Sequence, residues 1–115
     1  MALKRYAATS VATGGASTIT FNNTTIQMVN VLTVPASNEC AVVNFTLNGG
    51  ASGGLVAIGI YRNSELLDQI QLSVAAGDSV FVETKEFLEA GDVLRFGASN
   101  AGVTLAVSCD VSAIA

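Results

Sequence analysis

Apolar and polar residues alternate with a period of two along most of this chain, and Gly, Asn and Asp interrupt the alternation at short intervals. The clearest case runs from residue 40 to residue 48, where odd positions from Ala41 to Leu47 are apolar and even positions from Asn44 to Asn48 are polar. Successive side chains of a strand point to opposite faces of a sheet. The pattern therefore predicts a half-buried strand here.

The same reading predicts eight strands, and a further one at residues 6–12 would make nine. They lie at residues 17–21, 24–34, 40–48, 56–60, 66–74, 79–84, 93–98 and 103–111. Helix signals are nearly absent, and residues 83–90, the one stretch with some helical spacing, are expected to form a turn or a single helical turn. Many short strands with turn signals between them predict an all-β fold: an antiparallel, jelly-roll-like β-sandwich of about eight strands.

A chain of 115 residues is about one domain long. We expect residues 15–115 to form a single β-sandwich domain. The polar first 14 residues end in Thr13-Gly14-Gly15 and are the candidate for an N-terminal arm that orders on docking. Residues 48–54 contain four glycines and should form a mobile loop.

Composition adds an expectation of contact with other chains. Half of the residues are hydrophobic and only 12% are charged, against about 25% in an ordinary domain. The net charge of −4 opposes binding to nucleic acid. No apolar run is long enough to cross a membrane, and the start lacks the apolar core of a signal peptide, so we expect synthesis in a cytoplasm and no membrane contact.

Several apolar residues stand opposite the core parity of their own strands. In residues 24–34 these are Val29 and Val31, and in their own strands they are Val42 and Phe81. Several such residues in a chain with few charges predict a protein interface. We therefore expect a closed homo-oligomer, with Val29, Val31, Val42 and Phe81 as its interface residues.

The sequence offers no catalytic constellation. It contains no histidine, and two cysteines cannot form a closed zinc site alone. The acids from Glu83 to Asp92 are expected to be a solvated face, with a carboxylate pair for glycoside hydrolysis as the less favoured reading. Ala-Gly-Asp occurs at 76–78 and 90–92, which predicts two similar turns at one end of the sandwich rather than a calcium site. No enzyme activity, cofactor or metal is expected.

Strand parity also predicts that the two cysteines are free. Cys40 shares parity with Asn44 and Thr46 on the polar face, whereas Cys109 shares parity with apolar residues. A bridge between them would need a bulge or a shift of frame. Three matches to the N-glycosylation pattern, at Asn22, Asn23 and Asn44, are read as chance matches.

Most of the chain resembles the small jelly-roll modules of bacteriophage heads and tails. The resemblance lies in the polar N-terminal segment, residues 31–35 (VLTVP), the hairpin 58–63 (IGIYRN) and the late segments 87–96 (FLEAGDVLRF) and 103–108 (VTLAVS). The portion from Leu88 to Leu94 also resembles a strand entry of the trimeric jelly rolls of the C1q and tumour-necrosis-factor type.

The resemblance implies a non-enzymatic virion protein. Its most specific form is a capsid decoration, or cement, protein that binds the phage major capsid protein or other virion proteins, often as a trimer. The alternative is a carbohydrate- or receptor-binding module of a phage tail or fibre, because β-sandwiches often present ligand loops at one end. Few aromatic residues are available to stack on sugar, with seven in all and no tryptophan.

Overall fold

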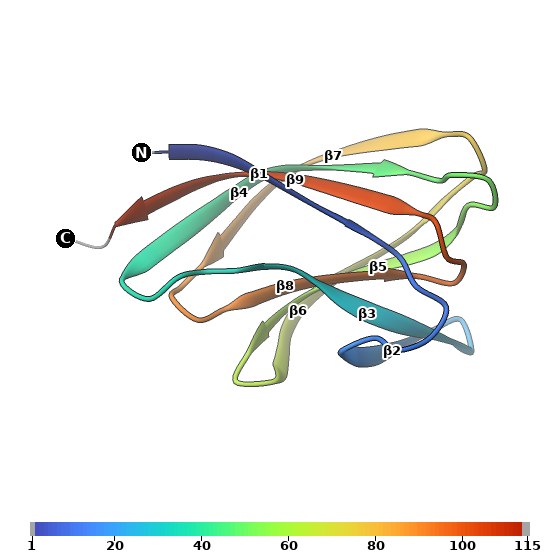
Figure 1. The fold of residues 1–115 in the computed structure, drawn as a ribbon, viewed down its shortest axis with the longest axis horizontal. Helices are drawn as coiled ribbons and strands as arrows, with labels where there is room; N and C mark the ends of the chain where they lie inside the picture. The colour runs from blue at the N-terminus through green and yellow to red at the C-terminus, as the bar shows by residue number, and fades with distance from the viewer. Residues whose placement is uncertain (1, 114–115) are drawn as a thin grey trace.

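Residues 2–113, which the computed structural model describes, form nine β-strands in two antiparallel sheets and contain no helix (Figure 1). The strands are β1 (Ala2–Thr9), β2 (Ser17–Phe21), β3 (Thr24–Thr33), β4 (Asn38–Asn48), β5 (Gly54–Arg62), β6 (Glu65–Val74), β7 (Ser79–Leu88), β8 (Val93–Ala98) and β9 (Thr104–Ala113). One sheet has the order β1-β9-β4-β7, and the other has the order β2-β3-β8-β5-β6.

This strand order is that of a jelly roll with β2 added at one edge. β1 pairs along its whole length with β9, so the start of β1 and the end of β9 lie at the same end of the sandwich (Figure 1). The predicted all-β, antiparallel, jelly-roll-like sandwich is confirmed, with nine strands. The segment predicted as an arm contributes β1 to the sheet, and its release as an arm stays a prediction; residues 1 and 114–115 lie outside the described range.

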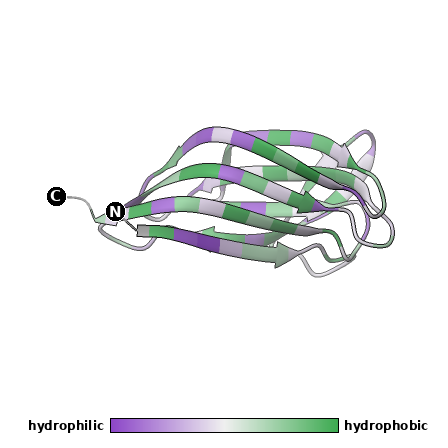
Figure 2. Ribbon diagram, turned by 90° about the horizontal axis from the view of Figure 1, so that it is seen from above, coloured by the Kyte–Doolittle hydropathy of each residue, from purple (hydrophilic) through white to green (hydrophobic). Residues whose placement is uncertain are grey.

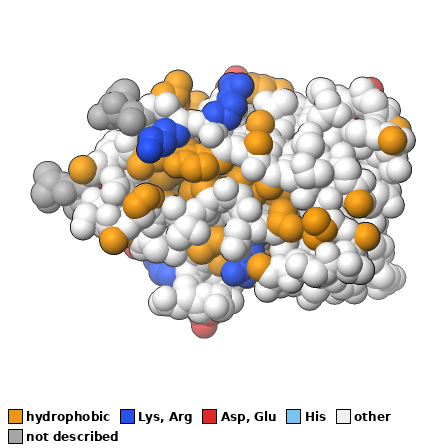
Figure 3. Space-filling view, viewed as in Figure 1, with side chains coloured by type: hydrophobic (Ala, Val, Ile, Leu, Met, Phe, Trp, Pro, Cys, Tyr) orange, Lys and Arg blue, Asp and Glu red, His pale blue; other side chains and the backbone are white. Residues whose placement is uncertain are grey.

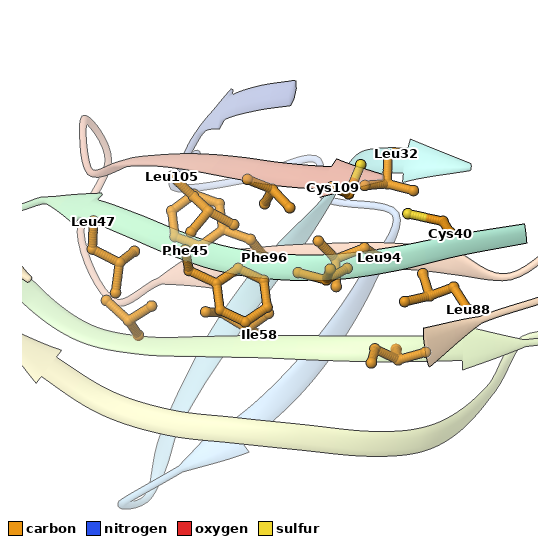
Figure 4. Close-up of a cluster of buried hydrophobic side chains, with 14 of the residues drawn as sticks. Leu32, Cys40, Phe45, Leu47, Ile58, Leu88, Leu94, Phe96, Leu105 and Cys109 are labelled. Atoms are coloured by element: carbon orange, nitrogen blue, oxygen red, sulfur yellow. The ribbon is translucent and has the colours of Figure 1, made fainter. Parts of the chain in front are cut away.

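The core lies between the two sheets and is built from their inward-facing side chains. Phe45 of β4 and Phe96 of β8 are fully buried at its centre, with leucines from β4, β8 and β9 around them (Figure 4). Apolar and polar residues alternate along the strands that Figure 2 shows from above. The period-two pattern of the sequence thus supplies one buried and one open face to each sheet.

A β-bulge at Val43 reverses the parity of β4. Val42 pairs with Cys109 of β9 and Asn44 pairs with Ser108, so Val43 is an extra residue opposite β9. Before the bulge the even positions are buried, and Val42 is only 2% exposed, whereas after it the odd positions are buried. The predicted surface position of Val42 is therefore wrong, because one inserted residue moves every earlier side chain to the other face.

The hairpin of β2 and β3 bends across the outer face of the five-stranded sheet. Ile26 and Met28 form, with Ile19 of β2 and Ala57 of β5, a second, smaller buried cluster apart from the main core. A Cβ at Gly97 of β8 would lie 2.2 Å from the Gln27 carbonyl oxygen. The missing side chain at Gly97 therefore lets the hairpin approach the sheet closely.

β7 continues through residues that were expected to turn. Residues 83–88 are the second half of this strand, with exposed and less exposed positions alternating, so the predicted turn or helical turn is wrong. The two Ala-Gly-Asp turns flank β7, one before Ser79 and one after Leu88. They lie at opposite ends of the strand, which corrects the expectation that both lie at one end of the sandwich.

The glycine-rich loop packs against neighbouring loops. Gly53 donates a backbone hydrogen bond to Gly49, and Gly77 donates one to Gly50, at 2.8 Å each. The Asn100 side chain also donates to the Gly53 carbonyl, at 3.0 Å. Hydrogen bonds therefore join three loops, at residues 49–53, 75–78 and 99–103, at one end of the sandwich.

No helix long and apolar enough to span a membrane occurs within residues 2–113.

Candidate functional site

The outer face of β4 and β7 exposes large apolar side chains. Phe81 is 60% exposed, Phe87 is 57% exposed, and Val43 is 45% exposed. We call these three residues the β7 patch. Aromatic side chains supply much of the binding energy at protein interfaces. This patch is therefore the candidate site for contact with another molecule.

Strand pairing fixes where the patch residues stand. Phe87 pairs with Ala41, and Phe81 pairs with Thr46 on the other side of the β4 bulge. Between them Thr84 and Lys85 stand opposite the single residue Val43. The local distortion leaves a shallow hollow with a volume of about 910 Å³. Its lining residues are Ala41, Val42, Val43, Asn44, Phe81, Glu83, Thr84, Lys85, Glu86 and Phe87.

Of the four interface residues predicted from the sequence, the structure brings two together. Val42 and Phe81 both line the hollow, although the Val42 side chain is buried. Val29 and Val31 lie on β3 in the other sheet, half-buried against the main core. Participation of the four residues in an interface stays a prediction.

Sequence reasoning missed the two other members of the β7 patch. Phe87 has the same parity as Phe81, but the strand was ended at residue 84, so the two were not connected. Val43 was assigned to the core because the bulge beside it was not recognised. Continuing the alternation of β7 to Leu88 would have found Phe87, whereas no clear sequence signal marks the bulge.

The two edge strands of the four-stranded sheet differ in charge. β1 carries Lys4 and Arg5, both exposed, at one edge. β7 carries Glu83, Lys85 and Glu86 at the opposite edge. Figure 3, which shows the side of the molecule with β1 and β3 in front, has basic side chains beside a central band of hydrophobic ones and acidic side chains only at the margins.

An ion pair holds the β7–β8 turn to β5. Arg62 donates two hydrogen bonds to Asp92, at 2.8 and 2.9 Å, and its Nη2 lies 3.0 Å from a carboxylate oxygen of Glu89. Asp92 also accepts a bond from the Glu89 backbone N–H at 2.9 Å, which closes the turn predicted at residues 90–92. The hydrogen bonds from Arg62 are the main reason that the pKa of Asp92 is lowered. This cluster fixes the β7–β8 turn against β5.

A second pair of acids lies where β6 and β7 approach one another. Burial raises the pKa of Glu86, and the neighbouring Asp68 carboxyl raises it further. Both residues line a cavity of only about 10 Å³, with Phe45 and Ile58 among the other lining residues. A sugar ring cannot enter a space of this size, so this carboxylate pair does not have the geometry of a glycosidase site.

The described residues offer no metal centre. Asp78 and Asp92 lie at opposite ends of β7, so they cannot converge on one calcium ion. Within residues 2–113 no three Cys, Asp or Glu side chains gather in a way that could hold a metal ion.

Comparison with known proteins adds a fold likeness. No protein-family model matches the chain, and no curated protein matches it. Among solved structures, it is similar to the subunit in "Bacillus endospore appendages form a novel family of disulfide-linked pili", with a TM-score of 0.55 and 16% identity over 99% of this chain and 87% of that one.

Two further solved structures are less similar. A Podospora anserina GH26-CBM35 β-(1,4)-mannanase gives a TM-score of 0.47 at 12% identity, over 98% of this chain and 28% of the other. An infectious bursal disease virus Gx strain structure gives 0.38 at 10% identity, over 94% and 33%. At 16% identity the likeness to the pilus subunit supports the all-β fold alone.

Proposed function

We propose that this chain is a non-enzymatic structural protein that assembles with copies of itself through the outer face of its four-stranded sheet. The β7 patch is the single observation on which the proposal rests. Phe81, Phe87 and Val43 leave about half or more of their side-chain surface open in the isolated chain. Burying a large apolar side chain completely contributes about 1.5–3 kcal/mol.

The charges favour a cyclic assembly over a two-fold dimer. The basic residues Lys4 and Arg5 lie at one edge of the sheet, and β7 at the other edge carries Glu83 and Glu86 with one basic residue, Lys85, between them. In a head-to-tail ring the β7 patch and the acidic edge beside it would face the basic edge of the next copy, and the ring closes without a free end. A trimer is the favoured ring size through resemblance to trimeric jelly rolls.

In its most specific form, the proposal is a capsid decoration protein of a bacteriophage. The jelly-roll strand order agrees with the sequence resemblance to phage head and tail modules. The structural neighbour from a pilus is another assembly of many subunits. The protein would be made in the host cytoplasm, act without a cofactor, and bind the phage major capsid protein on the virion.

Static light scattering of the purified chain tests self-assembly. We expect a mass that is a small multiple of 11.7 kDa at high micromolar concentration. The variant Phe81→Asp/Phe87→Asp should be monomeric, because assembly would bury unpaired charges in an apolar contact. The matched control is Leu67→Asp, which replaces a side chain 49% exposed on β6 of the other sheet and should leave the mass unchanged.

A monomer mass for the unmodified protein would refute intrinsic self-assembly. The decoration role has its own test: the chain should cosediment with phage heads assembled without it. Heads that pellet without the chain would contradict that role and leave the self-assembly proposal standing.

The carbohydrate-binding alternative would place ligands at the loops. The loop segments 49–53, 75–78 and 99–103 contain no aromatic residue, and several of their polar groups bond to one another. A glycan array probed with the fluorescently labelled chain would favour this alternative if one sugar class bound and the loop variant Asn100→Ala removed the signal.

A further inference from the structure

The two cysteines of the chain lie together inside the main core, on adjacent strands. Cys40 is 1% exposed on β4, and Cys109 is 0% exposed on β9. Figure 4 shows both sulfurs at the same end of the core, with the Cys40 thiol pointing toward β9. We propose that Cys40 and Cys109 are a built-in modification site, at which a peroxide oxidises the two thiols to a disulfide that joins β4 to β9.

The strand register places the two residues on a diagonal. Cys40 pairs with Val111, and Val42 pairs with Cys109, so the cysteines are offset by two positions on the same face of the sheet. Diagonal neighbours have Cα atoms about 7–8 Å apart in an ordinary sheet. A disulfide needs about 4.4–6.8 Å, so the backbone must shift by about an ångström along the strands to shorten this diagonal.

The bulge at Val43 makes the pairing possible. Without this extra residue, Cys40 would have the parity of Asn44 and point to the outer face, as the sequence analysis expected. With it, Cys40 and Cys109 both face the core. Bulges also increase the local twist of a strand pair, which changes the separation of diagonal neighbours.

Burial makes the reaction slow in the closed structure. Burial raises the pKa of both thiols. The pKa of Cys40 reaches about 12, because the neighbouring Cys109 thiol raises it further. The thiolate is the nucleophile, so few reactive groups exist near neutral pH. Cys40 is the third residue of β4, and Cys109, the sixth of the ten residues of β9, lies opposite this end of β4. Fraying of this strand end would admit a small oxidant such as hydrogen peroxide.

The chemistry balances with one peroxide for each disulfide. One thiolate attacks a peroxide oxygen, the O–O bond breaks, and the departing hydroxide takes a proton to become water. The sulfenic acid that results is attacked by the second sulfur, so an S–S bond forms and the S–O bond breaks. The second hydroxide takes the proton of the second thiol and leaves as water. Two thiols are oxidised, and one peroxide is reduced to two waters.

The disulfide would constrain the unfolded chain. It closes a loop from residue 40 to residue 109, which spans more than half of the sequence. Long closed loops reduce the freedom of the unfolded state most. Oxidation after synthesis would therefore raise the free energy of unfolding of the domain.

Intact-protein mass spectrometry tests the site. The folded protein is treated with hydrogen peroxide, then denatured and alkylated with N-ethylmaleimide. We expect loss of two hydrogens and no alkylation, with both properties reversed by dithiothreitol. The oxidised form should also unfold at a higher urea concentration than the reduced form. The controls Cys40→Val and Cys109→Val should each lose no hydrogens and should remain alkylated once.

Three results would overturn the proposal. One is an oxidised protein that gains oxygen atoms at the cysteines without losing two hydrogens. Another is a disulfide that links separate chains on a non-reducing gel. The third is wild-type protein that stays doubly alkylated after exposure long enough for amide exchange at the ends of β4 and β9. The self-assembly test uses neither cysteine, so the two proposals fail independently.

Discussion

The two sheets of the sandwich treat their outer faces differently. The five-stranded sheet is covered by its own chain over β5 and β8, because the β2–β3 hairpin folds over Ala57 and Gly97 and buries Ile26 and Met28, while Leu67 of its edge strand β6 stays exposed. The four-stranded sheet has no such cover among the described residues and exposes Phe81 and Phe87. The comparison suggests that another molecule covers the outer face of the four-stranded sheet, as the β2–β3 hairpin covers part of the five-stranded sheet.

Small residues explain why only one sheet accepts a cover. β5 is buried on both faces along most of its length, and its outward positions include Ala57 and Gly59. A backbone can approach a sheet closely only where side chains are small or absent. The corresponding positions of β7 hold Phe81, Lys85 and Phe87, which project from the surface. Such side chains suit a pocket or groove on a partner rather than a flat strand.

The largest effect is expected from adding a side chain beneath the covering hairpin. In Gly97→Val the new Cβ would meet the Gln27 carbonyl oxygen at 2.2 Å and a methyl of Ile26 at 2.7 Å. The hairpin must shift, which should cost about 3 kcal/mol or more. Thermal unfolding should show a melting temperature lower by on the order of 10 °C.

Ala106→Val is the matched control for this variant, because it adds bulk to the outer face of the uncovered sheet. Its stability should change little. An equal loss of stability in both variants would contradict the contrast between a covered and an uncovered face.

An intermediate effect is expected at the ion pair that links the two sheets. Arg62 ends β5, whereas Asp92 lies in the turn that follows β7. Asp92→Asn should cost at most about 1.5–3 kcal/mol in urea unfolding, the range for hydrogen bonds to charged groups, since Arg62 is 43% exposed and regains water. Unchanged stability would show that the turn holds its position without the charge.

The lowered pKa of Asp92 fixes the direction in which pH should change the stability difference between wild type and Asp92→Asn. The pKa of Asp92 is lower in the folded chain than in the unfolded chain. Its contribution is therefore complete above the unfolded pKa and is lost as the pH falls through the folded pKa. Between neutral pH and acid, the difference in urea midpoint between wild type and Asp92→Asn should shrink.

The smallest effect is expected at Glu86, where the edge strands β6 and β7 of the two sheets approach one another. Burial and Asp68 raise the pKa of Glu86, so its contribution is complete below the unfolded pKa and is lost as the pH rises through the folded pKa. Glu86→Gln should remove this loss, and its urea midpoint should change less than that of wild type from weakly acidic to neutral pH. An equal change of urea midpoint with pH in the two proteins would refute the raised pKa of Glu86.

The sequence predicted the sheets better than it predicted their surfaces. Alternation in β9 and in the second half of β4 was enough for the fold class, because each strand must place one face in the core. The bulge at Val43 defeated the same rule for Val42 and Cys40, since a single added residue is invisible in a hydropathy pattern. The bend of β3 similarly moved Met28 away from the core that Leu32 enters.

Only part of the candidate site could be predicted from the sequence, for a related reason. Phe81 was identified by its parity, and it stands at the edge of the hollow. Phe87 was lost because acids in the second half of β7 were taken for a turn. Which faces of a sandwich are covered depends on contacts between distant segments, such as Gln27 with Gly97, and local sequence patterns do not contain this information.

Hydroxyl-radical footprinting with mass spectrometry tests the central claim most directly, because it reports the exposure of individual side chains on both sheets in one experiment. The chain is labelled at high concentration and again after dilution until it is monomeric. The account predicts that labelling of Phe81 and Phe87 rises severalfold on dilution, while that of Leu67 on β6 stays constant. Equal labelling of Phe81 and Phe87 at both concentrations, in a protein whose mass shows assembly, would contradict it.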